Sequence, residues 1–346
     1  MTIAIYITLF LLSCGVLIKG GSLLVNGLIK VANFFHLSEF VVAFVLIAIG
    51  TSLPELFVGV RAALGCVPVF SLGNIIGSNI ANLTLIIGLP VILARGIKIK
   101  SKIVYEDALY MLVVALLPIL LLLDKKLSRV DGCILMLVFT LYVFNLFPLP
   151  QKRGGILYKF SKGLNNLFFL LHLRRKEEGI EKGGTEEISD HISRKDVFKN
   201  FLLCAGGLIL LLVGAEGAVR FASLLAQEML IPLILIGLVI TPIGTALPEL
   251  TFGLKAVKVA RHEMILGNLI GSVVANSALV LGIVALIHPI VIENFALFLV
   301  SGVFLVISLL IFVIFIRTKE ELSWQEGMIL VLLFIGFIIA EMIAKG

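Results

Sequence analysis

Two glutamates, Glu55 and Glu249, each lie near the middle of a long apolar run of the sequence. Inside a bilayer, a charged side chain costs roughly 3 kcal/mol or more. The nearest basic residues, Arg61 and Lys255, stand six positions further on, about 240° around a helix, and not at the facing spacings of three or four. A remote side chain, a proton or a bound cation must therefore balance each charge. We expect a cation or proton site, because ionisable residues at membrane depth are functional by default.

Each glutamate directly follows a proline, Pro54 or Pro248, at the end of a Gly-Thr-x-Leu-Pro string. Proline lacks a backbone N–H and its ring clashes with the preceding turn, so we expect both helices to kink or unwind across this string. Freed backbone carbonyls, such as those of Thr51 and Thr245, could then face a cavity. A simple packing kink is the alternative, but broken helices at matching places in two halves are typical of a transport site.

The apolar runs that follow carry two stripes along the helix at a spacing of four residues, so the members of each stripe share one face. The polar stripes are Asn74, Ser78 and Asn82, and Asn268, Ser272 and Asn276. Beside them run small residues, which let helices approach closely: Gly73, Gly77 and Ala81, and Gly267, Gly271 and Ala275. We expect these helices to pack against the broken ones and to direct oxygen atoms at the two glutamates.

Carboxylates, amide oxygens, hydroxyls and backbone carbonyls together suit a hard cation such as calcium or sodium. Zinc or copper would require histidine or cysteine, and near these motifs only Cys66 and His262 occur, both toward helix ends. Two carboxylates balance one divalent ion, and monovalent ions or protons could neutralise them in the alternate state. Competition of this kind is a chemical basis for ion exchange.

These residues belong to a duplicated segment. Residues 50–89 align without a gap to residues 244–283 at a constant offset of 194, with 18 of 40 positions identical. The duplication indicates two halves of five helices each. Because five is odd, the second half must enter the membrane from the opposite side, which gives the inverted repeats of secondary transporters.

The composition requires such a membrane architecture. Hydrophobic residues make up 60% of the 346 residues and charged residues 14%, with a mean hydropathy of +1.15, which excludes a soluble enzyme. We expect an all-α membrane protein with ten transmembrane helices. The runs that predict them are 3–29, 39–64, 70–94, 104–123, 130–149, 199–226, 231–258, 263–288, 292–316 and 324–343.

The chain divides into an N-terminal five-helix repeat at 1–149, a charged linker at 150–198 and a C-terminal inverted repeat at 199–346. Most lysines and arginines lie in the linker and the other loops on its side, which by the positive-inside rule are cytoplasmic. Both termini are then extracytoplasmic, in the plasma (inner) membrane. The net charge of +6 reflects this topology, so we expect lipid and ions as partners and no nucleic acid.

A further charge, Glu216, lies in the run at 199–226, four residues before Arg220. This order favours a local ion pair on one helix. The alternative is a gating role for Glu216 on that helix.

The paired Gly-Thr-Ser/Ala-Leu-Pro-Glu-Leu and Gly-Asn-x-Ile-Gly-Ser-x-x-Ala-Asn strings resemble the alpha-repeats of the sodium/calcium exchanger family, within the calcium/cation antiporter superfamily. The resemblance implies that spans 1 and 6 slide against the rest to alternate access. The implied calcium ligands are the side chains of Glu55 and Glu249 and the backbone oxygens of Thr51 and Thr245. The implied sodium ligands are the same glutamates with Ser52, Ser78, Asn82 and Ser272.

Three positions of the second half depart from the pattern of many prokaryotic members. Asn276 stands where they often have Asp, Ala246 where they have Ser, and Val273 where they have Asn. The second half thus has one carboxylate and one hydroxyl fewer. We retain Asn276 in the predicted metal site, and both sodium and protons stay open as the coupling ion.

We therefore expect an antiporter that exchanges calcium for sodium by alternating access around the two glutamates, without a cofactor. Proton-coupled exchange of calcium or another divalent cation is the alternative. An intramembrane hydrolase would need a nucleophile beside a general base, and Ser78 and Ser272 have no histidine at a matching depth. A passive cation channel would lack dependence on a counter-ion.

Overall fold

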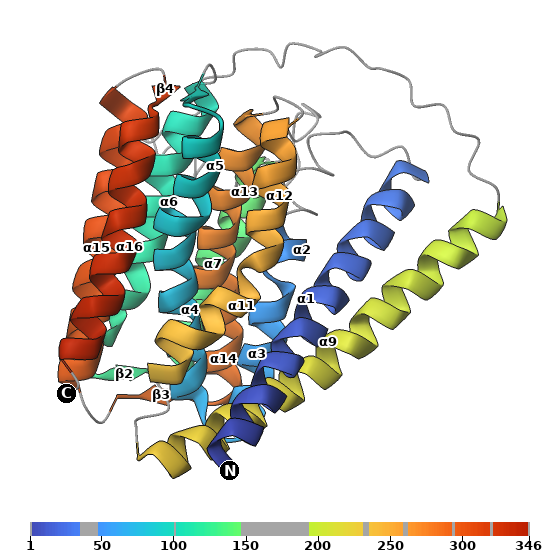
Figure 1. The fold of residues 1–346 in the computed structure, drawn as a ribbon, viewed down its shortest axis with the longest axis vertical. Helices are drawn as coiled ribbons and strands as arrows, with labels where there is room; N and C mark the ends of the chain where they lie inside the picture. Colours follow the sequence, from blue (N-terminus) through green and yellow to red (C-terminus); the bar gives the residue numbers. More distant parts are fainter. Residues whose placement is uncertain are drawn as a thin grey trace, which may run out of the picture.

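The computed structural model describes residues 2–34, 48–99, 102–146, 194–230, 235–258, 262–292, 295–318 and 321–344. These residues form a bundle of helices (Figure 1). The helical elements of the first half are α1 (Thr2–Phe34), α2 (Ala48–Thr51), α3 (Leu53–Leu64), α4 (Pro68–Ala81), η2 (Asn82–Ile86), α5 (Ile87–Leu93), α6 (Lys102–Leu121), η3 (Leu122–Asp124) and α7 (Arg129–Leu146).

The helical elements of the second half are α9 (Arg194–Met229), η4 (Ile236–Ile240), α11 (Thr241–Thr245), α12 (Leu247–Lys258), α13 (His262–Val274), η5 (Ala275–Val280), α14 (Leu281–Ile287), α15 (Phe295–Thr318) and α16 (Trp324–Ile343). The elements η2, η4 and η5 are π-helical turns, and η3 is a 3₁₀ turn. Two of the π turns, η2 and η5, contain Asn82 and Asn276 of the predicted polar stripes, and π turns are frequent at functional sites.

Eight segments of the described chain are long and apolar enough to cross a bilayer. They are Ile3–Leu23, Pro68–Leu93, Asp107–Asp124, Leu202–Met229, Ile236–Leu254, Met264–Ile287, Phe298–Arg317 and Trp324–Ile343. The two predicted runs absent from this set, 39–64 and 130–149, are described only in part. The count of ten spans therefore stays a prediction. The helix predicted to begin at 199 begins earlier, at Arg194, whereas most of the predicted linker lies outside the described residues.

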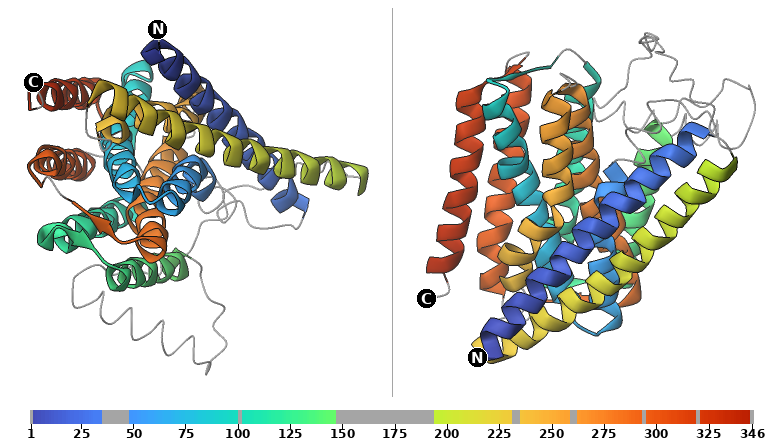
Figure 2. Two further views of the ribbon diagram at one scale, coloured as in Figure 1. Left: turned by 90° about the horizontal axis from the view of Figure 1, so that it is seen from below. Right: turned by 45° about the vertical axis from the view of Figure 1, so that its right-hand side comes forward.

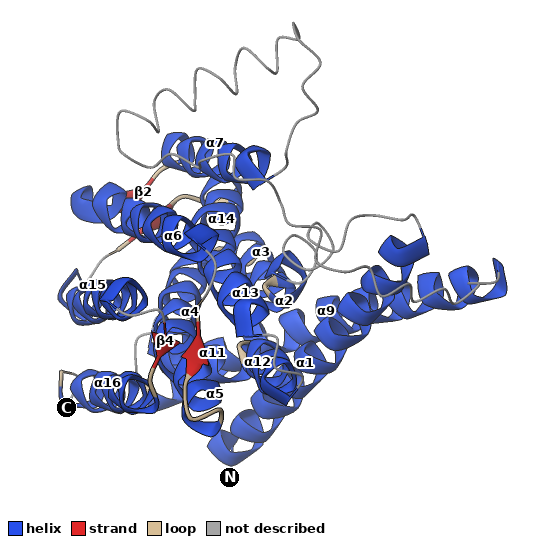
Figure 3. Ribbon diagram, turned by 90° about the horizontal axis from the view of Figure 1, so that it is seen from above, coloured by secondary structure: helices blue, strands red, loops and turns tan. Residues whose placement is uncertain are grey.

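The spans differ sharply in how deeply they are buried. Burial covers 83% of the Pro68–Leu93 span and 78% of the Met264–Ile287 span, but 28% of the span in α1 and 33% of that in α9. Seen along the bundle, α4 and α13 lie inside and α1, α9, α15 and α16 lie at the edge (Figure 3). The polar stripes predicted from the sequence therefore belong to the interior of the protein, away from lipid.

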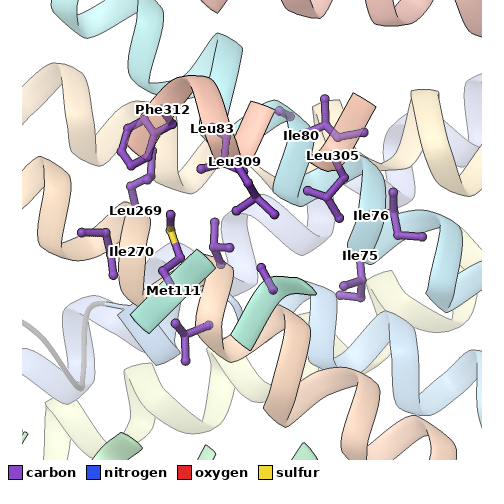
Figure 4. Packing of buried hydrophobic residues seen from close by; sticks show 14 of the residues in the cluster. Ile75, Ile76, Ile80, Leu83, Met111, Leu269, Ile270, Leu305, Leu309 and Phe312 are labelled. Atoms are coloured by element: carbon purple, nitrogen blue, oxygen red, sulfur yellow. The ribbon is translucent and has the colours of Figure 1, made fainter. Parts of the chain in front are cut away.

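Apolar packing holds this interior together where α4, α6, α13 and α15 meet (Figure 4). Leu72, Ile80, Met111, Leu266 and Phe312 are each fully buried there. Because lipid is as apolar as these side chains, dispersion and close fit stabilise the contact more than expulsion of water does.

The helices α1 and α9 lie side by side and cross the rest of the bundle at a slant (Figure 2). Their contact requires glycine at equivalent positions of the two halves, Gly20 and Gly214. A Cβ atom on Gly20 would lie 2.8 Å from the backbone nitrogen of Leu211, and one on Gly214 would lie 2.9 Å from that of Leu17. The two helices thus form a closely packed pair at the edge of the bundle.

An ion pair joins this pair of helices to the interior. The guanidinium of Arg61 in α3 donates from Nε to Oε2 of Glu216 in α9, and from its second nitrogen to Oε1 at 2.9 Å. The predicted local pair of Glu216 with Arg220 is therefore wrong. Helix spacing along α9 could not reveal a bidentate partner on another helix.

Two short antiparallel strand pairs close the bundle at opposite ends (Figure 1). Strand β1 (Ile97–Lys98) pairs with β4 (Glu321–Leu322), and β2 (Lys126–Leu127) pairs with β3 (Ile290–Val291). Each pair joins one strand from each half of the chain. The first and last described residues lie at the same end of the bundle (Figure 1).

Gly77 of α4 tests the close packing between halves. A Cβ here would overlap the carbonyl oxygen of Leu238 and lie 2.5 Å from Cγ of Pro242. Gly77→Ala should therefore lower the free energy of unfolding by about 1–3 kcal/mol, measured as a lower melting temperature of the purified protein in detergent.

The matched control is Gly336→Ala in α16, where nothing lies within 4 Å of the new Cβ. It should keep or slightly raise the melting temperature, because alanine favours a helix over glycine by about 1 kcal/mol. Equal melting temperatures of the two variants would contradict the proposed contact.

Candidate cation-binding site

The helices that carry the two glutamates are interrupted where the sequence predicted. One residue, Ser52, separates α2 from α3, with φ of −83° and ψ of 2°, and Ala246 separates α11 from α12. Because Pro54 and Pro248 have no N–H, each break leaves one carbonyl without its donor four residues on. Both glutamates lie in the first turn of the helix that follows, where the helix dipole favours negative charge.

All nine residues predicted for the site are buried, with exposed fractions of 4% or less. They are Thr51, Ser52, Glu55, Ser78, Asn82, Thr245, Glu249, Ser272 and Asn276. Burial at this level places every one of them out of contact with lipid tails.

The two threonines connect the halves through matching contacts. The Thr51 hydroxyl donates to Asn268 Oδ1 at 3.2 Å and lies 3.1 Å from the Ser272 hydroxyl. The Thr245 hydroxyl donates to Asn74 Oδ1 at 3.5 Å and lies 3.4 Å from the Ser78 hydroxyl. Each contact is the other shifted by 194 positions. Each broken helix is therefore held by the polar stripe of the opposite half.

The two carboxylates share this place. Ser78 donates to Oε1 of Glu55 at 3.4 Å, and the same hydroxyl lies 3.4 Å from that of Thr245, four residues before Glu249. In the described part of the chain, neither glutamate forms an ion pair with a basic residue. The predicted lack of a counter-ion on the same helix therefore extends to the described residues of the other helices.

Unsatisfied oxygen atoms gather around the carboxylates. Among the described residues, six buried oxygens of the predicted site have no hydrogen-bond partner: Ser52 Oγ, Glu55 Oε2, Asn82 Oδ1, both carboxylate oxygens of Glu249, and Asn276 Oδ1. Buried polar atoms in proteins normally have partners, so such a concentration needs an explanation. A hard cation, which takes oxygen ligands from carboxylates, amides and hydroxyls, fits this donor set.

Several neighbouring residues were missed as members of the site. Asn74 and Asn268 lay on the predicted stripes but were not assigned as site residues, and the structure shows that they anchor the threonines. Asn79 and Ser277 carried no signal, because they fall off the spacing of four. Asn79 nevertheless accepts a hydrogen bond from Asn276. Within the described chain, the Ser52 hydroxyl and both polar atoms of the Asn82 amide have no hydrogen-bond partner.

Comparison of the chain with known proteins identifies its family. The model of the sodium/calcium exchanger protein family matches residues 5–147 and 199–342. The sodium/calcium exchanger MaX1 of Methanosarcina acetivorans is 30% identical over 97% of this chain and 98% of its own length. The inner membrane protein YrbG of Escherichia coli is 29% identical over 88% of this chain and 86% of its own length.

A solved structure of the sodium-calcium exchanger NCX_Mj, soaked with sodium and calcium, has a TM-score of 0.62 and 27% identity, covering 97% of this chain and 98% of that one. The chain is thus a helical integral membrane protein, and those relatives whose names state an activity are exchangers or antiporters, not enzymes. The resemblance in the two repeated strings is confirmed. The chain belongs to the sodium/calcium exchanger family.

Proposed function

We propose that this protein is an antiporter that exchanges calcium for sodium across the plasma (inner) membrane by alternating access around Glu55 and Glu249. One observation carries the proposal: two buried carboxylates, without a basic partner in the described chain, lie among unsatisfied oxygens at two matching helix breaks. The names of the relatives, which include a sodium/calcium exchanger, agree with these ions.

The ligands follow from which atoms are available. Calcium takes 6–8 oxygen ligands, and we assign to it the carboxylates of Glu55 and Glu249 with the backbone oxygens of Thr51 and Thr245. Sodium would use the same glutamates with the neutral oxygens of Ser52, Ser78, Asn82, Ser272 and Asn276. Both ions then occupy one site and exclude each other.

Competition for one site explains why transport would be coupled. Without a bound ion, two buried carboxylates repel each other in surroundings of low dielectric constant, which costs several kcal/mol for each charge. A loaded site removes this cost. The protein would therefore change conformation with calcium or with sodium bound, and resist the change when empty.

We further propose ten spans in two inverted repeats, 1–149 and 199–346, joined by a cytoplasmic linker at 150–198. Matching threonine contacts between the halves support this arrangement. The two strand pairs, each made from both halves and located at opposite ends of the bundle, support it as well. Both termini would be extracytoplasmic, and they lie at one end of the bundle.

The parts that move would be α1 and α9. These helices pack closely on each other and obliquely on the bundle (Figure 2), whereas the side chains of all proposed ion ligands are buried. Sliding of α1 and α9 across the broken helices would open the site to one side and then to the other. The Arg61–Glu216 pair would hold one of the two positions.

Glu55→Gln and Glu249→Gln test the site. Each variant removes one of the two charges that balance calcium, so sodium-dependent calcium uptake should fall about tenfold or more, the effect of 1.4 kcal/mol or more. The measurement uses sodium-loaded vesicles diluted into sodium-free choline buffer with radioactive calcium.

Glu321→Gln, at an exposed glutamate of β4, is the matched control and should keep wild-type uptake. Wild-type calcium uptake in both Glu55→Gln and Glu249→Gln would refute the proposed cation site. Calcium uptake that depends on a pH gradient and is independent of sodium would show that protons, and not sodium, are the coupling ion.

Glu216→Gln tests the moving helices. The ion pair is half-exposed, so its loss should weaken the hold on α9 by about 0.4–1 kcal/mol, which corresponds to a rise in turnover of about twofold to fivefold. The KM for calcium should stay the same, because no proposed ligand changes.

The exchange of both charges, Arg61→Glu with Glu216→Arg, should restore the wild-type rate. Turnover that is unchanged in Glu216→Gln, or a change in the KM for calcium alone, would refute a latch between α9 and α3.

A further inference from the structure

A second polar cluster joins α4 to η5 beside the proposed ion site. Nδ2 of Asn79 donates to the hydroxyl of Ser277 at 2.8 Å, and Nδ2 of Asn276 donates to Oδ1 of Asn79 at 3.3 Å. All three side chains are almost completely buried. Asn79 therefore bridges the two halves of the chain and contacts a residue of the proposed site.

This bridge determines which end of the Asn276 amide is available. The amino group of Asn276 is engaged by Asn79, whereas its oxygen has no partner among the described residues. Only the oxygen can bind a cation, because an amide nitrogen has no free lone pair to offer. One helical turn earlier, Ser272 contacts Thr51, so Asn276 extends the same polar stripe.

The repeat supplies no equivalent bridge to Asn82. At the equivalent positions, Val273 stands for Asn79 and Leu83 for Ser277, and neither side chain can form these hydrogen bonds. Accordingly, both polar atoms of Asn82, the counterpart of Asn276, have no partner within the described chain. The Asn276 amide is therefore fixed by a hydrogen bond to its nitrogen, whereas no described residue fixes the Asn82 amide.

We propose that Asn79 is a positioning residue that holds the Asn276 amide with its oxygen toward the ion site and thereby supports sodium binding. This inference rests on the proposed exchange of calcium for sodium. The proposed calcium ligands are the two carboxylates and the backbone oxygens of Thr51 and Thr245, whereas the proposed sodium ligands include the Asn276 oxygen. The loss of a correctly turned amide oxygen should therefore weaken sodium binding more than calcium binding.

The test combines Asn79→Leu, which has a similar volume and no hydrogen bonds, with Asn276→Asp. A carboxylate has an oxygen at both ends, unlike an amide. The Asn276→Asp variant therefore does not need Asn79 to orient the side chain at position 276. The half-saturating sodium concentration and the KM for calcium are measured in vesicles for the wild type, both single variants and the double variant.

We expect Asn79→Leu to raise the half-saturating sodium concentration about fivefold to tenfold, the worth of one hydrogen-bond-sized contact, and the KM for calcium less than twofold. In the Asn276→Asp background, the same change should alter the sodium value less than twofold. An equal rise in both backgrounds, or a parallel rise for sodium and calcium, would show a merely structural role and overturn the proposal.

Ser277→Ala gives a second route if Asn79→Leu does not fold, because it removes only the hydroxyl that holds Asn79 and should shift sodium affinity in the same direction. Sodium-induced thermal stabilisation of the purified protein, compared with choline chloride, measures binding without transport. Wild-type protein without sodium-dependent calcium uptake would refute the proposed function. Sodium stabilisation unaffected by Asn79→Leu would refute the positioning role.

Discussion

The burial of two carboxylates without a basic partner in the described chain is the constraint on which the rest of the structure depends. Glu55 and Glu249 occupy the same interior region of a membrane protein, and no described basic side chain neutralises either of them. Two features reduce the cost of this arrangement: both glutamates lie in the first turn of a helix, and the Ser78 hydroxyl donates to Glu55. The negative charge that remains, together with the surrounding oxygens that lack hydrogen-bond partners, suits a bound cation.

Duplication provides the geometry that this constraint requires. A single half would bring one carboxylate and one broken helix, whose threonine hydroxyl would lack the asparagine that it contacts in the other half. In the observed contacts, each half supplies the threonine that the polar stripe of the other half receives. The break in one half is thus stabilised by the intact helix of the other, and the two carboxylates are brought to one place.

The packing separates a rigid interior from a pair of oblique helices. The interior consists of α4 and α13 with their π turns, enclosed by large apolar side chains (Figure 4). The oblique pair, α1 and α9, is held to itself by close backbone contact and to the interior by a half-exposed ion pair. A half-exposed ion pair is a weak restraint, which suits helices that are proposed to move while the ion ligands keep their geometry.

Sequence alone determined the chemical identity of the site and the local form of its helices. The glutamates, the breaks after Thr51 and Thr245 and the polar stripes could all be predicted, because charge at membrane depth, proline and a spacing of four residues act within one helix. The tertiary structure decided the partners: Arg61 for Glu216, Asn268 for Thr51, and Asn79 with Ser277 for Asn276. Periodicity reports which residues share a face of one helix. Which other helix meets that face depends on the packing of the whole chain, and contacts between residues more than 150 positions apart leave no trace in local spacing.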